Sequence, residues 1–278
     1  MASLAEATQN LNAADLDSVV EDGRRRAGKT LAQVLLTVLL VLGAFAYTGG
    51  LSAERYRGAV TTILTLVGES LPPDFSRWSN WGRPLLETLA MSVAGTALGT
   101  VAGLALGALA ARNTTPRWLH EPVRLLLNTA RSIPGLVWGV LFVASVGFGP
   151  LPGVFALAGH STGVLGKLYA EILEHVDPGP GNALRSQGVS PLGVLRFSLW
   201  PQIMPRIVDV TLYRWEHNLR AATTLGVVGA GGLGLEVVTA FHLFEYREAL
   251  ALILVMLALV TLINVAGAAI RGHLLHGA

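Results

Sequence analysis

The chain has 278 residues, of which 52% are hydrophobic and only 14% are charged, and its formal net charge is +2. Charged residues make up about 25% of a typical soluble domain, so this composition excludes an ordinary soluble protein and favours an all-α, polytopic membrane protein with a single domain. Cysteine is absent, which excludes disulfides and thiol chemistry, and no Cys/His cluster suggests a metal site. The isoelectric point near 9.2 fits basic cytoplasmic loops better than nucleic-acid binding.

The first apolar run covers residues 31–47 and follows a polar leader that ends in the basic residues Arg24, Arg25, Arg26 and Lys29. Positive charge beside a span marks its cytoplasmic end. We therefore expect residues 1–29 to be a cytoplasmic segment with a weak amphipathic helix, and residues 30–50 to be a membrane anchor. The alternative is a cleaved signal peptide, because residues 44–46 imitate a cleavage site; the long leader favours the uncleaved anchor.

Residues 51–83 are of mixed polarity and are expected to form an external loop. Within them, residues 59–67 are apolar but shorter than the roughly 20 residues that a span needs, so an interfacial or external helix is predicted there. Trp78 and Trp81 suit a membrane boundary.

Glycines recur at every fourth position of the second predicted span, residues 84–111. Residues at this spacing share one face of a helix, and small residues on a shared face let two membrane helices approach closely. We expect a helix-packing role for these four glycines: Gly95, Gly99, Gly103 and Gly107.

The third predicted span, residues 122–149, contains Pro134, which should break or kink the helix. Asn128, Arg131 and Ser132 place polar groups near membrane depth, where such groups usually face the bundle or a water-filled cavity. Alternatively, Arg131 extends to the inner membrane boundary. After a tight outer turn at residues 149–153, the fourth span is expected over residues 154–172, and it contains His160, either a structural histidine or part of a transport pathway.

Residues 177–205 predict two short helices joined at a glycine bend. The Pro-Gly run at residues 178–181 should break the preceding helix, and Asn182 is a candidate N-cap for a helix over residues 183–187. Gly188 can close that helix in a left-handed conformation. Ser190 and Pro191 should begin the second helix, with Leu192, Leu195 and Leu199 along one face and an end before Pro201. We call residues 177–205 the coupling bracket; it suits a groove on a soluble partner, and an ordinary interfacial loop is the alternative.

The fifth predicted span begins near Ile203 and is unusually polar. Charged groups in a span are costly unless they are paired or solvated. The planar fork of an arginine can bind a phosphorus oxyanion through two hydrogen bonds, whereas the alternative is internal pairing, such as Glu216 with Arg220 four residues later. The candidate substrate-pathway residues are Arg214, His217, Asn218 and Arg220 in this span, together with Arg131 and Ser132.

Residues 226–234 are rich in glycine but lack the βαβ surroundings of a dinucleotide site, so a re-entrant segment buried within protein is expected. The last span is predicted over residues 249–270, followed by a C-terminal tail, residues 272–278. The count is six spans with both termini in the cytoplasm.

The coupling bracket resembles the cytoplasmic coupling loop of ABC importer permeases, whose pattern is Glu-Ala-Ala, three residues, Gly, nine residues and Ile-x-Leu-Pro. Ala183, Gly188 and Pro201 match in register, while Asn182 replaces the acidic residue. The resemblance implies the type I permease fold with a pair of cytoplasmic coupling helices. It also implies these ATPase-coupling residues: Asn182, Ala183, Leu184, Gly188, Ser190, Leu192, Leu195 and Pro201.

Residues 130–134, 143–149 and 213–234 resemble phosphonate-type (PhnE-type) permeases, with the likeness spanning a permease core over residues 84–271. It implies a bacterial inner-membrane importer of phosphonate, phosphite or a related oxyanion. The implied partners are a second permease copy or paralogue, two cytoplasmic ATPases that bind ATP and Mg²⁺, and an extracytoplasmic solute-binding protein; this chain would have no catalytic site. The alternatives are an ion-coupled secondary transporter and an amino-acid or methionine-type permease.

Overall fold

The computed structural model describes residues 13–276, and the regular secondary structure of this part of the chain consists of helices, with no strand. The chain divides into two compact units, Met1–Thr65 and Leu66–Ala278.

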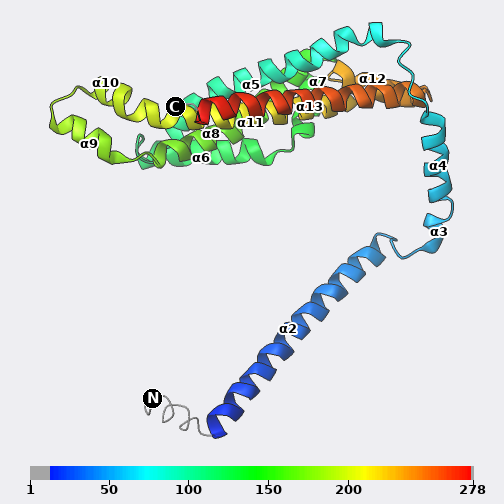
Figure 1. Cartoon of the computed structure of the whole chain (residues 1–278), viewed down its shortest axis with the longest axis horizontal. Coiled ribbons are helices and arrows are strands. Elements are labelled where there is room, and N and C mark those ends of the chain that lie inside the picture. Colours follow the sequence, from blue (N-terminus) through cyan, green and yellow to red (C-terminus); the bar gives the residue numbers. More distant parts are fainter. Residues whose placement is uncertain (1–12, 277–278) are drawn as a thin grey trace. The chain divides into compact units, whose positions relative to one another are not determined.

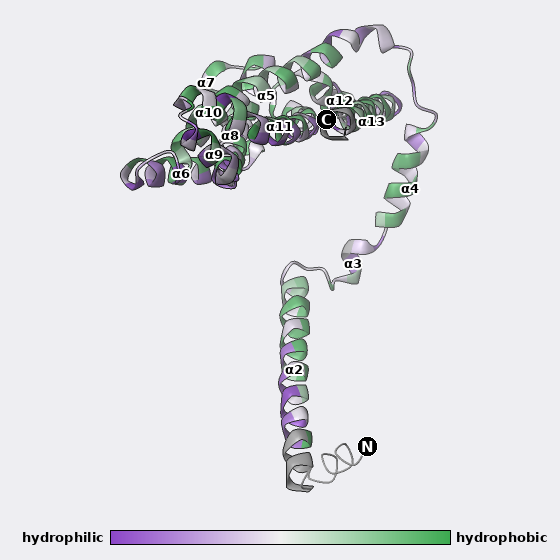
Figure 2. Ribbon diagram, turned by 60° about the vertical axis from the view of Figure 1, so that its left-hand side comes forward, coloured by the Kyte–Doolittle hydropathy of each residue, from purple (hydrophilic) through white to green (hydrophobic). Residues whose placement is uncertain are grey.

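The first unit contains α2 (Ala13–Tyr47), α3 (Ala53–Tyr56) and most of α4 (Ala59–Ser70). Its stretch Val20–Tyr47 is long and apolar enough to cross a membrane, and Figure 2 shows its hydrophobic residues toward the C-terminal half. The predicted anchor lies in this helix, but the helix begins earlier than expected and includes the basic cluster, because arginine and lysine are good helix formers. The part of the predicted amphipathic segment over residues 1–12 lies outside the described residues.

The second unit is a helical bundle, shown in Figure 1, whose central pair is α5 (Gly82–Ala110) and α8 (Pro150–Glu174). On α8 pack α6 (Arg117–Ser132), α7 (Gly135–Val146) and α11 (Trp200–Leu225). The last helix, α13 (Tyr246–His276), lies against α11 and α12 (Gly232–His242). Helix α13 therefore runs through most of the predicted C-terminal tail.

The four glycines of α5 lie at its contact with α8, and all four are buried. A Cβ added at Gly99 would lie 2.6 Å from Ser161 Cβ, and one at Gly107 would lie 2.7 Å from the Gly166 carbonyl oxygen. The two backbones thus approach so closely that any side chain on this face would force them apart.

The predicted third span is not one helix. Helices α6 and α7 meet at Ile133–Pro134 with a bend of 90°. Proline lacks the N–H that would continue the helix and disfavours helical geometry in the residue before it, so the chain breaks here rather than kinking mildly. The predicted outer turn also shortens, because Pro150 and Pro152 belong to the first turn of α8.

Three described helices are long and apolar enough to cross a membrane, or up to five if each of two bent pairs counts as one span. The sequence predicts six. The difference is α8, which carries Lys167, Glu171 and Glu174 and is sheltered by its neighbours along much of its length. A helix at the centre of a bundle does not need an apolar surface all round. By length and composition alone, α8 therefore does not count as a span.

The glycine-rich segment after α11 turns back into the bundle. A 3-10 turn, η3 (Gly226–Val228), is followed by Gly229 at φ 91° and Gly231 at φ 79°, both in the left-handed region that favours glycine. A Cβ at Gly226 would meet the backbone of Gly234, so the two chain segments touch directly. Residues 230–234 are buried, as the expected re-entrant segment requires.

Candidate functional site

The coupling bracket forms two short helices, as predicted, but the first begins earlier. Helix α9 spans Pro178–Ser186, and its N-cap is Asp177, whose Oδ1 accepts a hydrogen bond of 2.9 Å from the Gly179 N–H. The prediction of Asn182 as the N-cap is therefore wrong. Proline is well tolerated in the first turn of a helix, so the Pro-Gly run ends α8 and begins α9.

The bend between the two helices has the predicted geometry. Gly188 has φ +78°, in the left-handed region. Ser190 is the N-cap of α10 (Pro191–Val194), and its Oγ accepts a hydrogen bond of 3.3 Å from the Gly193 N–H. These conformational predictions are confirmed; the coupling role of the same residues stays a prediction.

The second helix does not end before Pro201. It continues through a π-helical turn, η2 (Leu195–Leu199), directly into α11. In this wider turn the Trp200 N–H bonds to the Leu195 carbonyl, five residues back. The wider turn leaves room for the Pro201 ring, which would otherwise clash with the carbonyl four residues back. The bracket is thus joined to α11 by continuous helix.

Most of the predicted coupling residues are accessible. Asn182, Ala183, Gly188, Leu192 and Leu195 are exposed, as are Ser190 and Pro201, whereas Leu184 is half-buried. Arg185 Nη1 donates to Asn182 Oδ1 at 3.2 Å. The bracket therefore offers a surface on which another protein can bind.

A buried polar cluster joins α5, α8 and α11 in the middle of the bundle. Ser161 Oγ accepts hydrogen bonds from Arg214 Nε at 2.9 Å and from Asn218 Nδ2 at 2.8 Å. Asn218 Nδ2 also donates to Thr96 Oγ1 at 2.8 Å. Asn218 and Ser161 are fully buried, and Arg214 is only 6% exposed. Two predicted pathway residues, Arg214 and Asn218, thus meet at one serine.

Arg214 has no ionic partner among the described residues; its hydrogen bond to Ser161 is to a neutral group. A buried guanidinium without a carboxylate is costly unless water or an anion compensates it. The free end of its fork is chemically suited to a carboxylate, phosphite or phosphonate oxygen pair.

The other four predicted pathway residues are exposed in this chain. Arg131 Nε donates to Asn128 Oδ1 at 3.1 Å, and Ser132 Oγ donates to the Asn128 carbonyl at 2.7 Å, both at the end of α6. Arg220 Nη1 donates to Asn264 Oδ1 at 3.2 Å, and His217 is exposed on α11. The structure therefore does not bring the six residues into one cluster.

Glu216 is paired internally, as the alternative for this span held, but its partner is not Arg220. Glu216 instead pairs with Arg271 of α13, which also lies 4.0 Å from Asp209. Gly267 makes room for this pair, because a Cβ there would overlap the Glu216 carboxylate. The sequence places Glu216 and Arg271 far apart, whereas the packing of α11 on α13 brings them together.

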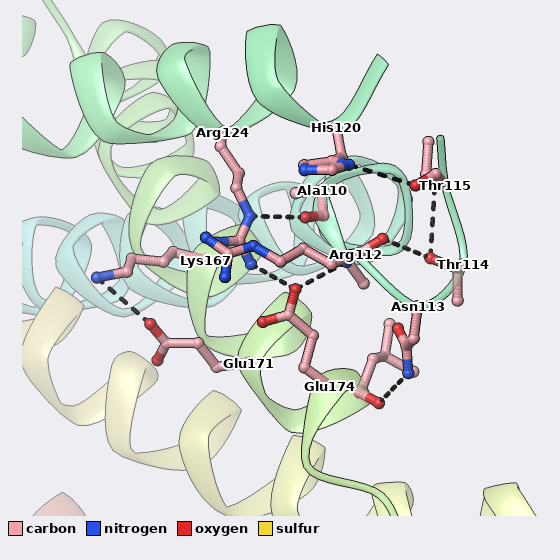
Figure 3. Close-up of polar contacts among 12 residues, drawn as sticks. Ala110, Arg112, Asn113, Thr114, Thr115, His120, Arg124, Lys167, Glu171 and Glu174 are labelled. Atoms are coloured by element: carbon pink, nitrogen blue, oxygen red, sulfur yellow. Dashed lines mark hydrogen bonds and ion pairs between the residues drawn. The ribbon is translucent and has the colours of Figure 1, made fainter. Parts of the chain in front are cut away.

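Sequence reasoning missed a polar cluster where α5, α6 and α8 meet, shown in Figure 3. Glu174 Oε1 accepts from the Arg112 N–H at 2.7 Å and from Arg124 Nη2 at 2.6 Å, while Arg124 Nε donates to the Ala110 carbonyl at 2.8 Å. Burial alone would raise the pKa of Glu174, but the Arg112 hydrogen bond and the Arg124 guanidinium outweigh it, so the pKa is lowered. The cluster closes the carbonyl end of α5.

A second cluster that sequence reasoning missed lies at the start of α13. Arg77 Nη1 pairs with Glu245 and Glu248 at 2.8 Å each, and Trp81 Nε1 donates to Glu248 at 3.2 Å. The Ser76 N–H lowers the pKa of Asp74 nearby. A cleft of about 650 Å³ is lined by residues that include Arg77, Glu245, Glu248, Asp74 and Ser76.

Two grooves on the face of α5 and α11 are apolar. They measure about 550 and 340 Å³, and Thr100, Thr211 and Leu212 line both. An oxyanion would lose its hydration there without gaining partners, so these grooves are unsuitable for it, and the polar cluster at Arg214 remains the better candidate.

Residues 103–276 match the family described as binding-protein-dependent transport system inner membrane component. The phosphite transport system permease protein PtxC of Stutzerimonas stutzeri is 47% identical over 246 residues, which cover 88% of this chain and 90% of that protein. The phosphate-import permease protein PhnE of Mycolicibacterium smegmatis is 40% identical over 214 residues, covering 77% of this chain and 40% of that protein.

A solved structure of the MetNI methionine ABC transporter in an inward-facing conformation has a TM-score of 0.63 with this chain at 24% identity, covering 72% of this chain and 99% of that chain. At this identity the likeness concerns the fold. The predicted all-α, polytopic type I permease fold is thereby confirmed. These relatives give no support to an ion-coupled secondary transporter or to a preference for methionine.

Proposed function

Because the chain belongs to the family of binding-protein-dependent transport system inner membrane components, we propose that it is the permease subunit of an ATP-driven importer for phosphite, phosphonate or a related phosphorus oxyanion. The substrate class rests on relatives whose names specify phosphite and phosphate import. It also rests on the chemistry of one residue in the bundle.

The burial of Arg214 without an acidic partner among the described residues is the structural observation that supports a phosphorus oxyanion as the substrate. The Arg214 guanidinium is nearly buried, its Nε is held by Ser161, and no carboxylate in the described part of the chain neutralises it. When the helices part during transport, the free end of the fork can bind two oxygens of the anion. Asn218 and Thr96 position Ser161 and so hold the arginine in place. His217, Arg220, Arg131 and Ser132, which are exposed, are proposed to line the route to and from this point.

The coupling bracket is proposed to bind a separate cytoplasmic ATPase. The π turn joins α10 to α11 without a break, so a movement of the bracket is transmitted to the helix that carries Arg214. Closure of two ATPases around ATP would then favour one orientation of the bundle over the other, because the closed pair binds one bracket arrangement more tightly. ATP and Mg²⁺ belong to that partner.

The complete importer is proposed to contain two permeases, identical or paralogous, two ATPases and an extracytoplasmic solute-binding protein. The chain would lie in a bacterial inner membrane with both termini in the cytoplasm, since basic residues of α2 precede its apolar stretch and Arg271 lies near the end of α13. The cleft at Arg77 and Glu248 would then face outward.

The test is phosphite uptake by cells that depend on this transporter, comparing wild type with Arg214→Ala. We expect at least a tenfold loss of uptake at low substrate concentration, since a hydrogen bond to a charged group is worth about 1.5–3 kcal/mol. Arg214→Lys should retain part of the uptake, because a lysine keeps the positive charge but lacks the planar guanidinium that can form two hydrogen bonds to one anion.

Arg117→Ala, at an exposed arginine of α6, is the matched control and should transport normally. Each variant is first checked for membrane abundance and thermal stability. An Arg214→Ala chain that is present at wild-type levels and takes up phosphite with unchanged KM and rate would contradict the role of Arg214.

A further inference from the structure

The coupling bracket contains one carboxylate, Asp177 at its first residue, which caps α9 by accepting a hydrogen bond from the Gly179 N–H. Beyond Asp177, the bracket and the start of α11 carry positive charge only. From residue 178 to residue 208 the sequence contains Arg185, Arg196 and Arg206 but no aspartate or glutamate. All three arginines are exposed. The region is therefore a cationic surface in a chain whose overall charge is nearly balanced.

Nothing within the described chain neutralises the two arginines of the bracket. Arg185 is hydrogen-bonded to the neutral amide of Asn182 at 3.2 Å. The Arg196 guanidinium lies 5.7 Å from the centre of the Phe197 ring, a cation–π contact that leaves its charge intact. Neither takes part in an ion pair among the residues that the structure describes.

Apolar side chains lie exposed beside this charge. Leu192 is 77% exposed, Phe197 is 67% exposed and Leu195 is 47% exposed. Exposed apolar groups that cluster with charge around them mark a protein interface. Figure 1 shows α9 and α10 extending as a hairpin beyond the ends of the neighbouring helices α6 and α8, which is a shape that enters a groove rather than covering a flat surface.

We propose that the groove that receives the bracket is apolar at its base and acidic at its rim, with carboxylates of the ATPase facing Arg185 and Arg196. This inference rests on the proposed docking of an ATPase and adds the chemistry of that partner. Asn182 is uncharged and the Asp177 carboxylate is engaged in capping the start of α9, so the charge that the rest of the bracket presents is that of Arg185 and Arg196. Complementary charge would speed association and exclude ATPases whose groove is basic.

The test uses the full-length chain in nanodiscs of uncharged lipid and the ATPase subunit that copurifies with it, once that subunit has been identified and produced separately. Affinity is measured at low and high salt for wild type, Arg185→Glu with Arg196→Glu, and Arg185→Gln with Arg196→Gln. Leu192→Ala with Phe197→Ala tests the apolar contact. Arg117→Glu, on α6, is the matched charge control.

We expect the glutamate pair to weaken binding at least tenfold and the control to bind normally. Salt should weaken the wild type more than the glutamine pair, because ionic contacts at a rim are screened. A lysine placed at the facing carboxylate of the ATPase, found by cross-linking, should restore binding to the glutamate pair.

Three results would overturn the inference in distinguishable ways. If only the apolar variant loses affinity, the bracket docks but its charge does not matter. If the charge variants bind the ATPase normally but lose binding to vesicles that contain anionic lipid, the arginines serve the membrane. If every variant binds like wild type, or no ATPase copurifies, the proposed docking itself fails.

Discussion

Arg214 is buried, where an unpaired charge costs free energy. Its hydrogen-bond partner Ser161 is neutral and so fixes the position of the guanidinium without neutralising its charge. Ser161 accepts a hydrogen bond from the Arg214 guanidinium and another from Asn218, and all three side chains are buried. A carboxylate in the same position would fix the guanidinium more firmly but would compete with a transported anion. The absence of one among the described partners therefore fits a binding group better than a structural ion pair.

Asn218 is the residue on which this arrangement depends. Its amide bridges Thr96 on α5 and Ser161 on α8, so Asn218→Ala would leave both hydroxyl groups without that partner. We expect a loss of stability of about 1–3 kcal/mol, the cost of unsatisfied buried polar groups, measured by thermal unfolding of the purified chain in detergent. Asn128→Ala, at an exposed asparagine on α6, should change little; an equal loss in both variants would refute the special role of Asn218.

At the scale of elements, the coupling bracket depends on one backbone conformation. Gly188 has φ +78° with open space around its Cα, so a substitution there acts through backbone strain and not through a clash. Asparagine tolerates the left-handed region, whereas a β-branched residue does not.

Gly188→Val should therefore abolish coupling, whereas Gly188→Asn should retain it. We expect the Gly188→Val chain to assemble poorly with the ATPase, or the assembled importer to hydrolyse ATP without transport. The reason is that valine would alter the bend and so reorient α9 relative to α10. Uptake and ATPase activity of the reconstituted importer are measured together. Normal uptake by Gly188→Val would count against the docking role of the bracket.

The junction of α5, α6 and α8 gives a pH prediction. Because the pKa of Glu174 is lowered in the folded chain, its carboxylate stabilises the fold fully above its unfolded-state pKa of about 4.3. That contribution is lost as the pH falls through the lower folded-state pKa. Wild-type Tm should thus drop on acidification below about pH 4.3.

Glu174→Gln should lower Tm at neutral pH and reduce the drop on acidification, since its amide cannot pair with Arg124. Glu171→Gln, one turn earlier on α8, is the control. If Glu174→Gln and wild type followed the same Tm curve between neutral and acidic pH, Glu174 would not be the group responsible.

The sequence correctly predicted features whose conformation depends on a few neighbouring residues. Gly188 and Ser190 adopt their expected roles because a left-handed glycine and an N-cap each depend on a few neighbouring residues. Pro201 and Asn182 were misjudged for a related reason: a π turn and an earlier N-cap at Asp177 satisfy the same local rules equally well.

Pairs that depend on tertiary packing could not be predicted. Arg214 and Asn218 were identified as candidates from their type and spacing, but their shared partner, Ser161, belongs to another helix. Glu216 with Arg271, and Glu174 with Arg124, join residues far apart in sequence. No periodicity or motif connects such positions, so only the helix arrangement reveals them.

At the scale of the whole molecule, the helices of the second unit combine a closely packed centre with an exposed apolar exterior. Glycines draw α5 against α8, while leucines and valines on outer faces, such as Leu98, Val101 and Leu262, remain exposed. This distribution suits a bundle whose surroundings are lipid or another permease, because neither requires a polar surface. The polar surface is concentrated at the ends, on the coupling bracket and at the cleft near Arg77.

We propose that this bundle moves a phosphorus oxyanion with energy supplied by a separate ATPase. The most direct measurement is uptake of radiolabelled phosphite by proteoliposomes that contain the chain with its copurified ATPase and solute-binding protein. The account predicts uptake that requires ATP, is inhibited by excess phosphonate or phosphite but not by methionine, and is lost in Arg214→Ala. Uptake driven by an ion gradient without ATP, or inhibited by methionine alone, would contradict it.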